Sequence, residues 1–287
     1  RVKGFNLYLM GELRNSLASL RESLSLYRAM QEYLDAAKVQ LDLGIVYRSL
    51  GNLTETETCY LASLEFWQKT QNSLWQSNVL NNLGVLQHIR GHFEVAAQNL
   101  ERAIGYAKLA VNPRLECYSL TSLGDLYREI RAFHEAHKVF ELANGLLSGL
   151  NDLTLQIAVN LSRSNLERCE GNYHNAHHYL SEAEKLSHAG GSQYDEAQCL
   201  LTRGILGFQE RKIHHVQENL NKAGEFFRKE GYEADLLRSE FYSRLAFLYQ
   251  SATKNQIIDL CSWIEDHAAE PGKSSLLRLC YENRSFF

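Results

Sequence analysis

Small residues recur in this chain at a constant interval of 40 positions, in two columns that stand seven positions apart. The first, called here the mid-helix column, contains Gly4, Gly44, Gly84, Gly124, Ser164, Gly204 and Arg244. The second, called the turn column, contains Gly11, Gly51, Gly91, Arg131, Gly171, Arg211 and Ser251. Two columns with one period indicate a repeat array, a class of fold that forms interaction surfaces far more often than catalytic sites.

The composition favours long, uninterrupted helices. Only two prolines occur in 287 residues, and 45% of the residues are hydrophobic. A net charge of −4 gives no global case for binding nucleic acid or an anionic membrane. The six cysteines form no Cys-x-x-Cys pair, no segment resembles a signal peptide, and no apolar run approaches the roughly 20 residues that span a bilayer. We therefore predict a cytoplasmic, all-α protein without membrane or direct nucleic-acid contacts.

Each unit is predicted to contain two helices. Helix A ends near the turn column, as in segments 36–50 and 77–90, and helix B follows with apolar residues at helical spacing, as in Phe93, Ala96, Leu100 and Ala103. The mid-helix glycine lets helix B approach helix A closely, which offsets the low helix propensity of glycine. The turn glycine is predicted to close helix A in a left-handed conformation.

This pattern resembles the tetratricopeptide repeat family. The matching sets are Leu43-Gly44-Tyr47-Tyr60-Ser63, Leu83-Gly84-Ala96-Leu100-Ala103 and Leu123-Gly124-Tyr127-Ala136-Phe140-Ala143, with weaker sets around Ser164 and Gly204. The usual unit of the family has about 34 residues, so the longer period here resembles MalT-like and kinesin-light-chain-like units. The resemblance implies a right-handed superhelical solenoid of antiparallel helix pairs with about six to seven units.

The predicted domain is one array over residues 1–250. Its units lie near 1–35, 36–75, 76–115, 116–155, 156–195, 196–235 and 236–270, and residues 251–287 form capping helices, including helices over 256–269 and 274–283. Because Gly4 stands at the mid-helix position, the chain opens partway through a helix A. We therefore expect the parent protein to be longer.

The resemblance also implies that helix A lines a concave face, where the residue four positions after the mid-helix column faces the groove. These positions hold Arg48, His88, Arg128 and Arg168, called here the basic ladder. Asn82, Asp125 and Asn165 lie beside it, and Asn82 resembles groove asparagines that hold a bound peptide backbone. Guanidinium and amide groups suit carboxylates, phosphates or a peptide backbone. The predicted ligand is a protein, a peptide or a small anionic effector.

Two alternatives stay open at this point. The arginines of the basic ladder could instead pair with Glu129, Glu167 or Asp125 inside the array. Beyond Arg168 the groove positions become apolar, and this stretch is either a second half of the ligand site or the seat of the terminal helix. The stretch comprises Ile205, Phe208, Phe241, Leu245 and Leu248.

Histidine registers raise the question of a metal site. His134, His174 and His214 share one register, and His174 has helical spacing to His177 and His178. No carboxylate completes a ligand set, so we predict no metal and no cofactor. Phosphate-binding, dinucleotide-binding and nucleophile-elbow motifs are also missing from the sequence. An enzyme is therefore not expected, although a helical enzyme with an unrecognised site is a third possibility.

The leading functional prediction is a ligand-sensing or protein-binding region of a larger bacterial regulator, with roles in signalling and transcription regulation. Binding across several units is expected to tighten or open the superhelix, because adjacent units are joined only by nearest-neighbour interfaces. The alternative is a constitutive scaffold or cargo adaptor that senses nothing.

Overall fold

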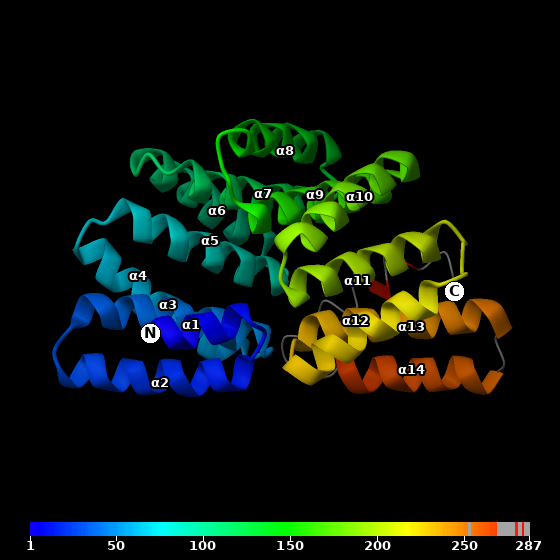
Figure 1. The fold of residues 1–287 in the computed structure, drawn as a ribbon, viewed down its shortest axis with the longest axis horizontal. Coiled ribbons are helices and arrows are strands. Elements are labelled where there is room, and N and C mark those ends of the chain that lie inside the picture. The colour runs from blue at the N-terminus through cyan, green and yellow to red at the C-terminus, as the bar shows by residue number, and fades with distance from the viewer. Residues whose placement is uncertain (252–253, 269–278, 281–282, 284–287) are drawn as a thin grey trace.

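The protein is described by a computed structural model, which covers residues 1–251, 254–268, 279–280 and 283. Its described secondary structure is entirely helical, and the helices form antiparallel pairs that wind into an arch (Figure 1). In chain order the helices are α1 (Val2–Leu9), α2 (Leu13–Ala29), α3 (Tyr33–Ser49), α4 (Leu53–Lys69), α5 (Ser73–Ile89), α6 (Phe93–Leu109), α7 (Pro113–Glu129), α8 (Phe133–Leu147), α9 (Leu153–Glu170), α10 (Tyr173–Gly190), α11 (Gln193–Gln209), α12 (Val216–Glu230), α13 (Glu233–Ser251) and α14 (Lys254–Ala268).

The helices follow the interval of the sequence columns. From α3 onward the odd-numbered helices begin at residues 33, 73, 113, 153, 193 and 233, in steps of 40. These are the A helices, and each is followed by an even-numbered B helix. The predicted all-α solenoid of antiparallel helix pairs is confirmed.

Helix A begins earlier than predicted. Segments 36–50 and 77–90 were expected, whereas α3 starts at residue 33 and α5 at residue 73. The reason for α5 is an N-cap: the side chain of Asn72 accepts a 3.2 Å hydrogen bond from the backbone N–H of Trp75. Equivalent caps stand at the same register in three later units. They are Asn112, Asp152 and Ser192.

The mid-helix column brings A and B helices into close contact, as predicted. A Cβ atom added at Gly84 would lie 2.6 Å from Cγ of Leu100 on the paired B helix, and one at Gly124 would lie 2.6 Å from Cζ of Phe140. Such distances leave no room for a larger side chain. Ser164 is accommodated because its hydroxyl donates a 2.8 Å hydrogen bond to the carbonyl oxygen of Ala176.

The turn column closes helix A, as predicted. Gly51 and Gly91 follow the ends of α3 and α5 with φ values of 76° and 80°, and Arg131 adopts the same left-handed region at 63°. The left-handed residue allows its own N–H and the next one to bond carbonyls of the last helical turn. The sharp reversal places helix B directly against helix A.

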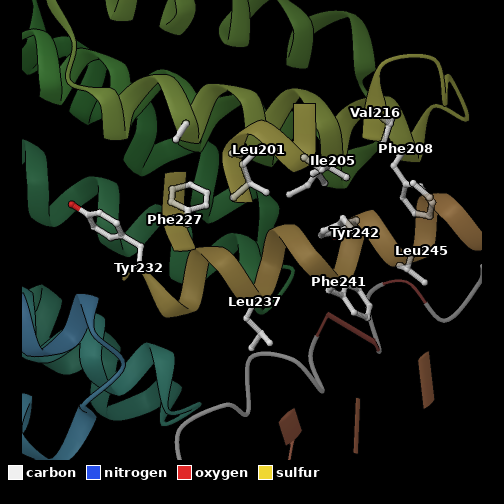
Figure 2. Close-up of a cluster of buried hydrophobic side chains, with 14 of the residues drawn as sticks. Leu201, Ile205, Phe208, Val216, Phe227, Tyr232, Leu237, Phe241, Tyr242 and Leu245 are labelled. Atoms are coloured by element: carbon white, nitrogen blue, oxygen red, sulfur yellow. The ribbon is translucent and has the colours of Figure 1, made fainter. Parts of the chain in front are cut away.

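Apolar side chains near the C-terminal end form a large buried cluster between α11, α12, α13 and α14. Figure 2 shows Ile205, Phe227 and Phe241 among its members, and all three are fully buried. The predicted helix over 256–269 corresponds to α14, which begins at residue 254. The predicted helix over 274–283 lies outside the described residues except for positions 279, 280 and 283. No described helix is long and apolar enough to cross a membrane.

Candidate functional site

The A helices form the inner layer of the arch. From α3 to α13 each A helix contacts the next A helix, in addition to the B helices beside it. Figure 1 shows α5, α7 and α9 beneath the outer α6, α8 and α10. The basic ladder therefore crosses four consecutive helices of one layer, near the C-terminal ends where the helix dipole favours cations.

Three residues of the ladder bond to the next A helix with a constant step of 41 residues. His88 Nε2 lies 2.7 Å from Oε2 of Glu129, and Arg168 Nη1 donates a 2.8 Å hydrogen bond to Oε1 of Gln209. Arg128 Nη1 lies 4.0 Å from Sγ of Cys169, which is also 41 residues later. The ladder therefore ties neighbouring units together.

Arg168 is the most deeply buried residue of the ladder, with 3% of its surface exposed. Its Nε donates a 3.3 Å hydrogen bond to Oδ1 of Asn165, whose own Nδ2 donates to the carbonyl oxygen of Leu161 at 3.0 Å. Its Nη2, in contrast, has no hydrogen-bond partner among the described residues. The predicted site residue Asn165 thus orients Arg168, and one donor of the guanidinium is left unmatched.

Asp125 joins two A helices. Its Oδ1 lies 3.4 Å from Nε of Arg128 on the same helix, and its Oδ2 accepts a 2.8 Å hydrogen bond from the hydroxyl of Ser162 on α9. The structure thus forms one of the internal contacts considered above, Arg128 with Asp125, and Glu129 pairs with the histidine of the ladder, His88. The third acid, Glu167, accepts instead from the side chain of Asn175 at 3.2 Å.

Asn82 is 7% exposed and its amide is engaged within the protein. Its Nδ2 donates to the carbonyl oxygen of Asn78 at 2.9 Å, and its Oδ1 accepts from the hydroxyl of Tyr60 at 3.4 Å. These contacts hold the Asn82 side chain on the inner layer. The backbone of a bound peptide would therefore have to replace the 3.4 Å hydrogen bond between Tyr60 and Asn82.

Arg48 differs from the other ladder residues because the position 41 residues later is Ile89, which has no side-chain acceptor. Burial opposes the charge of Arg48, but nearby hydroxyls of Tyr60, Tyr8 and Tyr194 and the carboxyl group of Asp235 together raise its pKa above the ordinary value. Two of these groups, on α11 and α13, come from the opposite end of the chain.

This proximity reflects a closed turn of the solenoid. Tyr8 and Leu50 pack against the C-terminal cluster that contains Phe227 and Tyr232, and Leu13 is buried within it. Figure 1 shows α1–α3 beside α12 and α13. We call this contact the seam. It brings the two ends of the array together beside Arg48.

The apolar stretch of the inner layer is covered. Ile205, Phe208, Phe241 and Leu245 are at most 4% exposed and share a cluster with Leu260 and Trp263 of α14. Leu279 and Cys280 also pack against this cluster, and Nδ2 of Asn283 donates a 3.1 Å hydrogen bond to the hydroxyl of Tyr242. The described C-terminal residues therefore lie against this stretch.

Residues 35–108 match a family model described as tetratricopeptide repeat. These residues carry tetratricopeptide repeats. The match begins in α3 and ends in α6, so it covers the two helix pairs that contain Gly44 and Gly84. Repeats of this type stack into extended surfaces that bind other molecules. The finer likeness to MalT-like or kinesin-light-chain-like units stays a prediction.

Solved structures extend the tetratricopeptide-like fold to most of the chain. The apo form of RapI has 14% identity and a TM-score of 0.59, with coverage of 90% of this chain and 97% of that one. A Rap protein complexed with Competence and Sporulation Factor has 13% identity and a TM-score of 0.65, with coverage of 91% and 74%. A tetratricopeptide repeat protein from Parabacteroides merdae has 19% identity and a TM-score of 0.52, with coverage of 96% and 95%. No curated protein matches the sequence.

The histidines at or just before the starts of the later B helices lie on the outside. His134, His174 and His214 are exposed, and in the described part of the chain no three metal-ligating side chains converge. His177 pairs with Glu210 at 2.5 Å, and His137 pairs with Glu170 at 2.6 Å. Both pairs join a B helix to the end of the next A helix, so they link successive units.

Sequence reasoning named Glu129 as a possible partner of the ladder arginines but missed its pairing with His88, the acceptor Gln209 and the whole seam. Glu129 and Gln209 stand 41 residues after a ladder residue, so this offset would have found them. Tyr8, Tyr194 and Asp235 carried no such signal, because they approach Arg48 only through the curvature of the array. The candidate site thus consists of the ladder together with the polar groups of the seam.

Proposed function

We propose that this chain is a non-catalytic binding region of a larger, bacterial regulatory protein, and that it holds a peptide, a protein segment or a small anionic effector on its inner layer. The proposal places the protein in the cytoplasm, with signalling or transcription control exerted by further domains. The proposed array spans residues 1–250, and residues 251–287, of which the structure describes only a part, are proposed to cap it. Arg48, Asn82, His88, Asp125, Arg128, Asn165 and Arg168 are the proposed contact residues.

The unmatched donor of Arg168 carries this proposal. A buried N–H without an acceptor costs about 1–3 kcal/mol, which an incoming carboxylate or backbone carbonyl oxygen would recover. Arg128 occupies the same register on α7, the A helix that contacts α9. The inner layer therefore carries two guanidinium groups on neighbouring A helices. Carboxylate and phosphate groups match guanidinium geometry better than other ligands do.

The seam supplies a route from binding to regulation. A ligand that spans several A helices changes the small rotation between successive units, and the change accumulates at the two ends of the turn. Opening or tightening of the seam would then shift the activity of attached domains. The similar fold of a Rap protein complexed with Competence and Sporulation Factor supports a ligand-bound state for this kind of array.

A scaffold or cargo adaptor is the second candidate, and exposed apolar residues beside the α2–α3 turn favour it. Leu26, Met30, Tyr33 and Leu34 are 57%, 67%, 59% and 47% exposed. Four large apolar side chains within nine residues are typical of a protein contact surface. A scaffold would bind its partners through these apolar side chains beside the α2–α3 turn, without any change at the seam.

The test is selection of binders from a displayed library of random peptides. The bait is the wild type, and the comparison is the triple variant Arg48→Ala, Arg128→Ala, Arg168→Ala. A matched triple variant, Arg14→Ala, Arg102→Ala, Lys138→Ala, removes three exposed cations outside the ladder. We expect selected peptides to be rich in Asp and Glu and to bind the ladder variant at least tenfold more weakly. Unchanged binding by a folded ladder variant would contradict the proposal.

Scattering distinguishes the two candidates. A sensor changes its radius of gyration when a selected peptide binds, whereas a scaffold keeps it constant. Binding that instead disappears in a Met30→Glu, Leu34→Glu variant would favour the scaffold.

A further inference from the structure

The seventh helix pair breaks the rule of the mid-helix column. In the earlier pairs the column residue is glycine or serine, and at Gly204 an added Cβ atom would lie 2.6 Å from Cγ of Leu220, sixteen positions later. In α13 the column residue is Arg244, and its counterpart on α14 is Leu260. A guanidinium group cannot occupy that narrow space. The two helices must therefore leave room beside Arg244.

That room is a hollow of about 250 Å³ between α12, α13 and α14. Arg244, Phe247 and Leu260 line it, and Phe247 is 51% exposed. A second hollow of about 220 Å³ also contains Arg244 and continues along α12 past Asn221 and Gly224. The two hollows share Ser243 and Arg244 in their linings, and together they are called here the groove.

Arg244 is held in place yet retains its hydrogen-bond donors. Its Cζ lies 4.8 Å from the ring centroid of Trp263, so the guanidinium rests over the indole. Among the described residues no hydrogen bond or ion pair occupies Arg244. The nearby carboxylate of Glu240 is engaged by Arg228 at 2.8 Å. A stacked guanidinium with open donors is pre-organised for a carboxylate.

The groove meets the inner layer at Leu248, but no residue of the basic ladder lines it. Ser243 and Phe247 lie on the side of α13 opposite Arg238 and Leu245, because residues two or five positions apart in a helix point in opposed directions. Leu245 belongs to the buried cluster near the C-terminal end. A ligand in this groove would therefore not touch the basic ladder, and this inference does not depend on the function proposed above.

We propose that this groove binds the carboxyl terminus of a peptide. The terminal carboxylate accepts hydrogen bonds from Arg244, its apolar side chain packs on Phe247 and Leu260, and the preceding residues run along the second hollow past Asn221. Carboxylates of Glu225, Glu240 and Asp259 border the groove. These charges repel polyanions, so a single carboxylate with an apolar body fits better than a phosphate or a nucleic acid.

The test uses the indole N–H signals of the ¹⁵N-labelled protein. The chain has three tryptophans, and Trp67 and Trp75 lie at α4 and α5, away from the groove. The probe is N-acetyl-Ala-Leu-Phe with a free carboxyl terminus, and the control ligand is the same peptide with a terminal amide. A Trp263→Phe variant assigns the Trp263 signal. We expect saturable movement of that signal alone, and at least tenfold weaker binding of the amide.

Three variants test the residues. Arg244→Ala should weaken binding at least tenfold and Phe247→Ala at least threefold, whereas Arg203→Ala, a half-exposed arginine of α11, should leave it unchanged. Phe247→Ala also keeps the proposal testable if Arg244→Ala does not fold, because Phe247 is half exposed. Absence of a saturable shift, equal binding of acid and amide, or equal binding by folded Arg244→Ala would overturn the proposal. So would displacement of the probe by inorganic phosphate.

Discussion

The hydroxyl of Tyr194 donates a 3.1 Å hydrogen bond to Oδ2 of Asp235, which lies 41 residues later on the next A helix. The same step joins His88 to Glu129. Asp235 also lies near Arg48, which belongs to α3 at the opposite end of the array. Contacts between residues 41 positions apart therefore connect neighbouring units. In the pair of Tyr194 and Asp235, both side chains also lie near Arg48 across the seam.

Loss of the Arg48 charge is expected to weaken the seam. Arg48→Met keeps much of the side-chain length but removes the cation that lies near Asp235, so the free energy of unfolding should fall by about 1–3 kcal/mol. The radius of gyration should rise in X-ray scattering as the turn opens. The matched control is Arg102→Met on the exposed face of α6. Equal scattering curves for the wild type and Arg48→Met would show that Arg48 does not hold the seam.

The mid-helix glycines are expected to tolerate no methyl group. Gly124→Ala places a Cβ atom 2.6 Å from the ring of Phe140, and such overpacking costs about 1–3 kcal/mol. Gly105→Ala is the matched control, because Gly105 lies inside α6 with no atom within 4 Å of the added Cβ. This control should gain about 0.5–1 kcal/mol from helix propensity. Urea unfolding measures both, and equal signs for the two changes would refute the packing argument.

Two asparagines at the N-cap position of a helix are expected to differ in their contribution to stability. The Asn112 side chain accepts a 2.9 Å hydrogen bond from the backbone N–H of Leu115, whereas Asn52 precedes α4 without a side-chain cap bond. Asn112→Ala should therefore lower the free energy of unfolding by about 1 kcal/mol. Asn52→Ala should have a much smaller effect. Thermal and urea unfolding of the two variants provide the comparison, and equal losses would argue against the cap.

Thiol reactivity should follow burial. Burial raises the pKa of Cys117 to about 11 and that of Cys199 to about 12, so both remain thiols at pH 8, where exposed Cys261 should react first with an aromatic disulfide reagent. The unfolded thiols ionise near pH 9. Their contribution to stability is therefore complete below pH 9 and is lost as the pH rises from about 9 to 12. Replacement of Cys199 by Ser should reduce this alkaline loss. Labelling of Cys199 as fast as Cys261 would contradict the burial.

Most of the fold was predictable because its determinants are local and repeated. The mid-helix glycines, the turn glycines and the apolar spacing identify the helix pairs, since each acts within one unit. The starts of the A helices were placed too late because the capping role of Asn72 was overlooked. For the candidate site, the register predicted which residues share the inner layer. It did not show that Asp125 and Asn165 are already bonded within the array.

The sequence by itself determined the period, the helix pairing and the position of the basic ladder, because these follow from side-chain size and spacing inside each unit. Only the tertiary structure decided how the ends meet and how α14 sits beside Arg244. The seam between Tyr8 and Tyr232 depends on small rotations that add up over all the units, and no local pattern encodes their sum. The groove at Arg244 depends on how two helices part around one large side chain, which depends on packing in three dimensions.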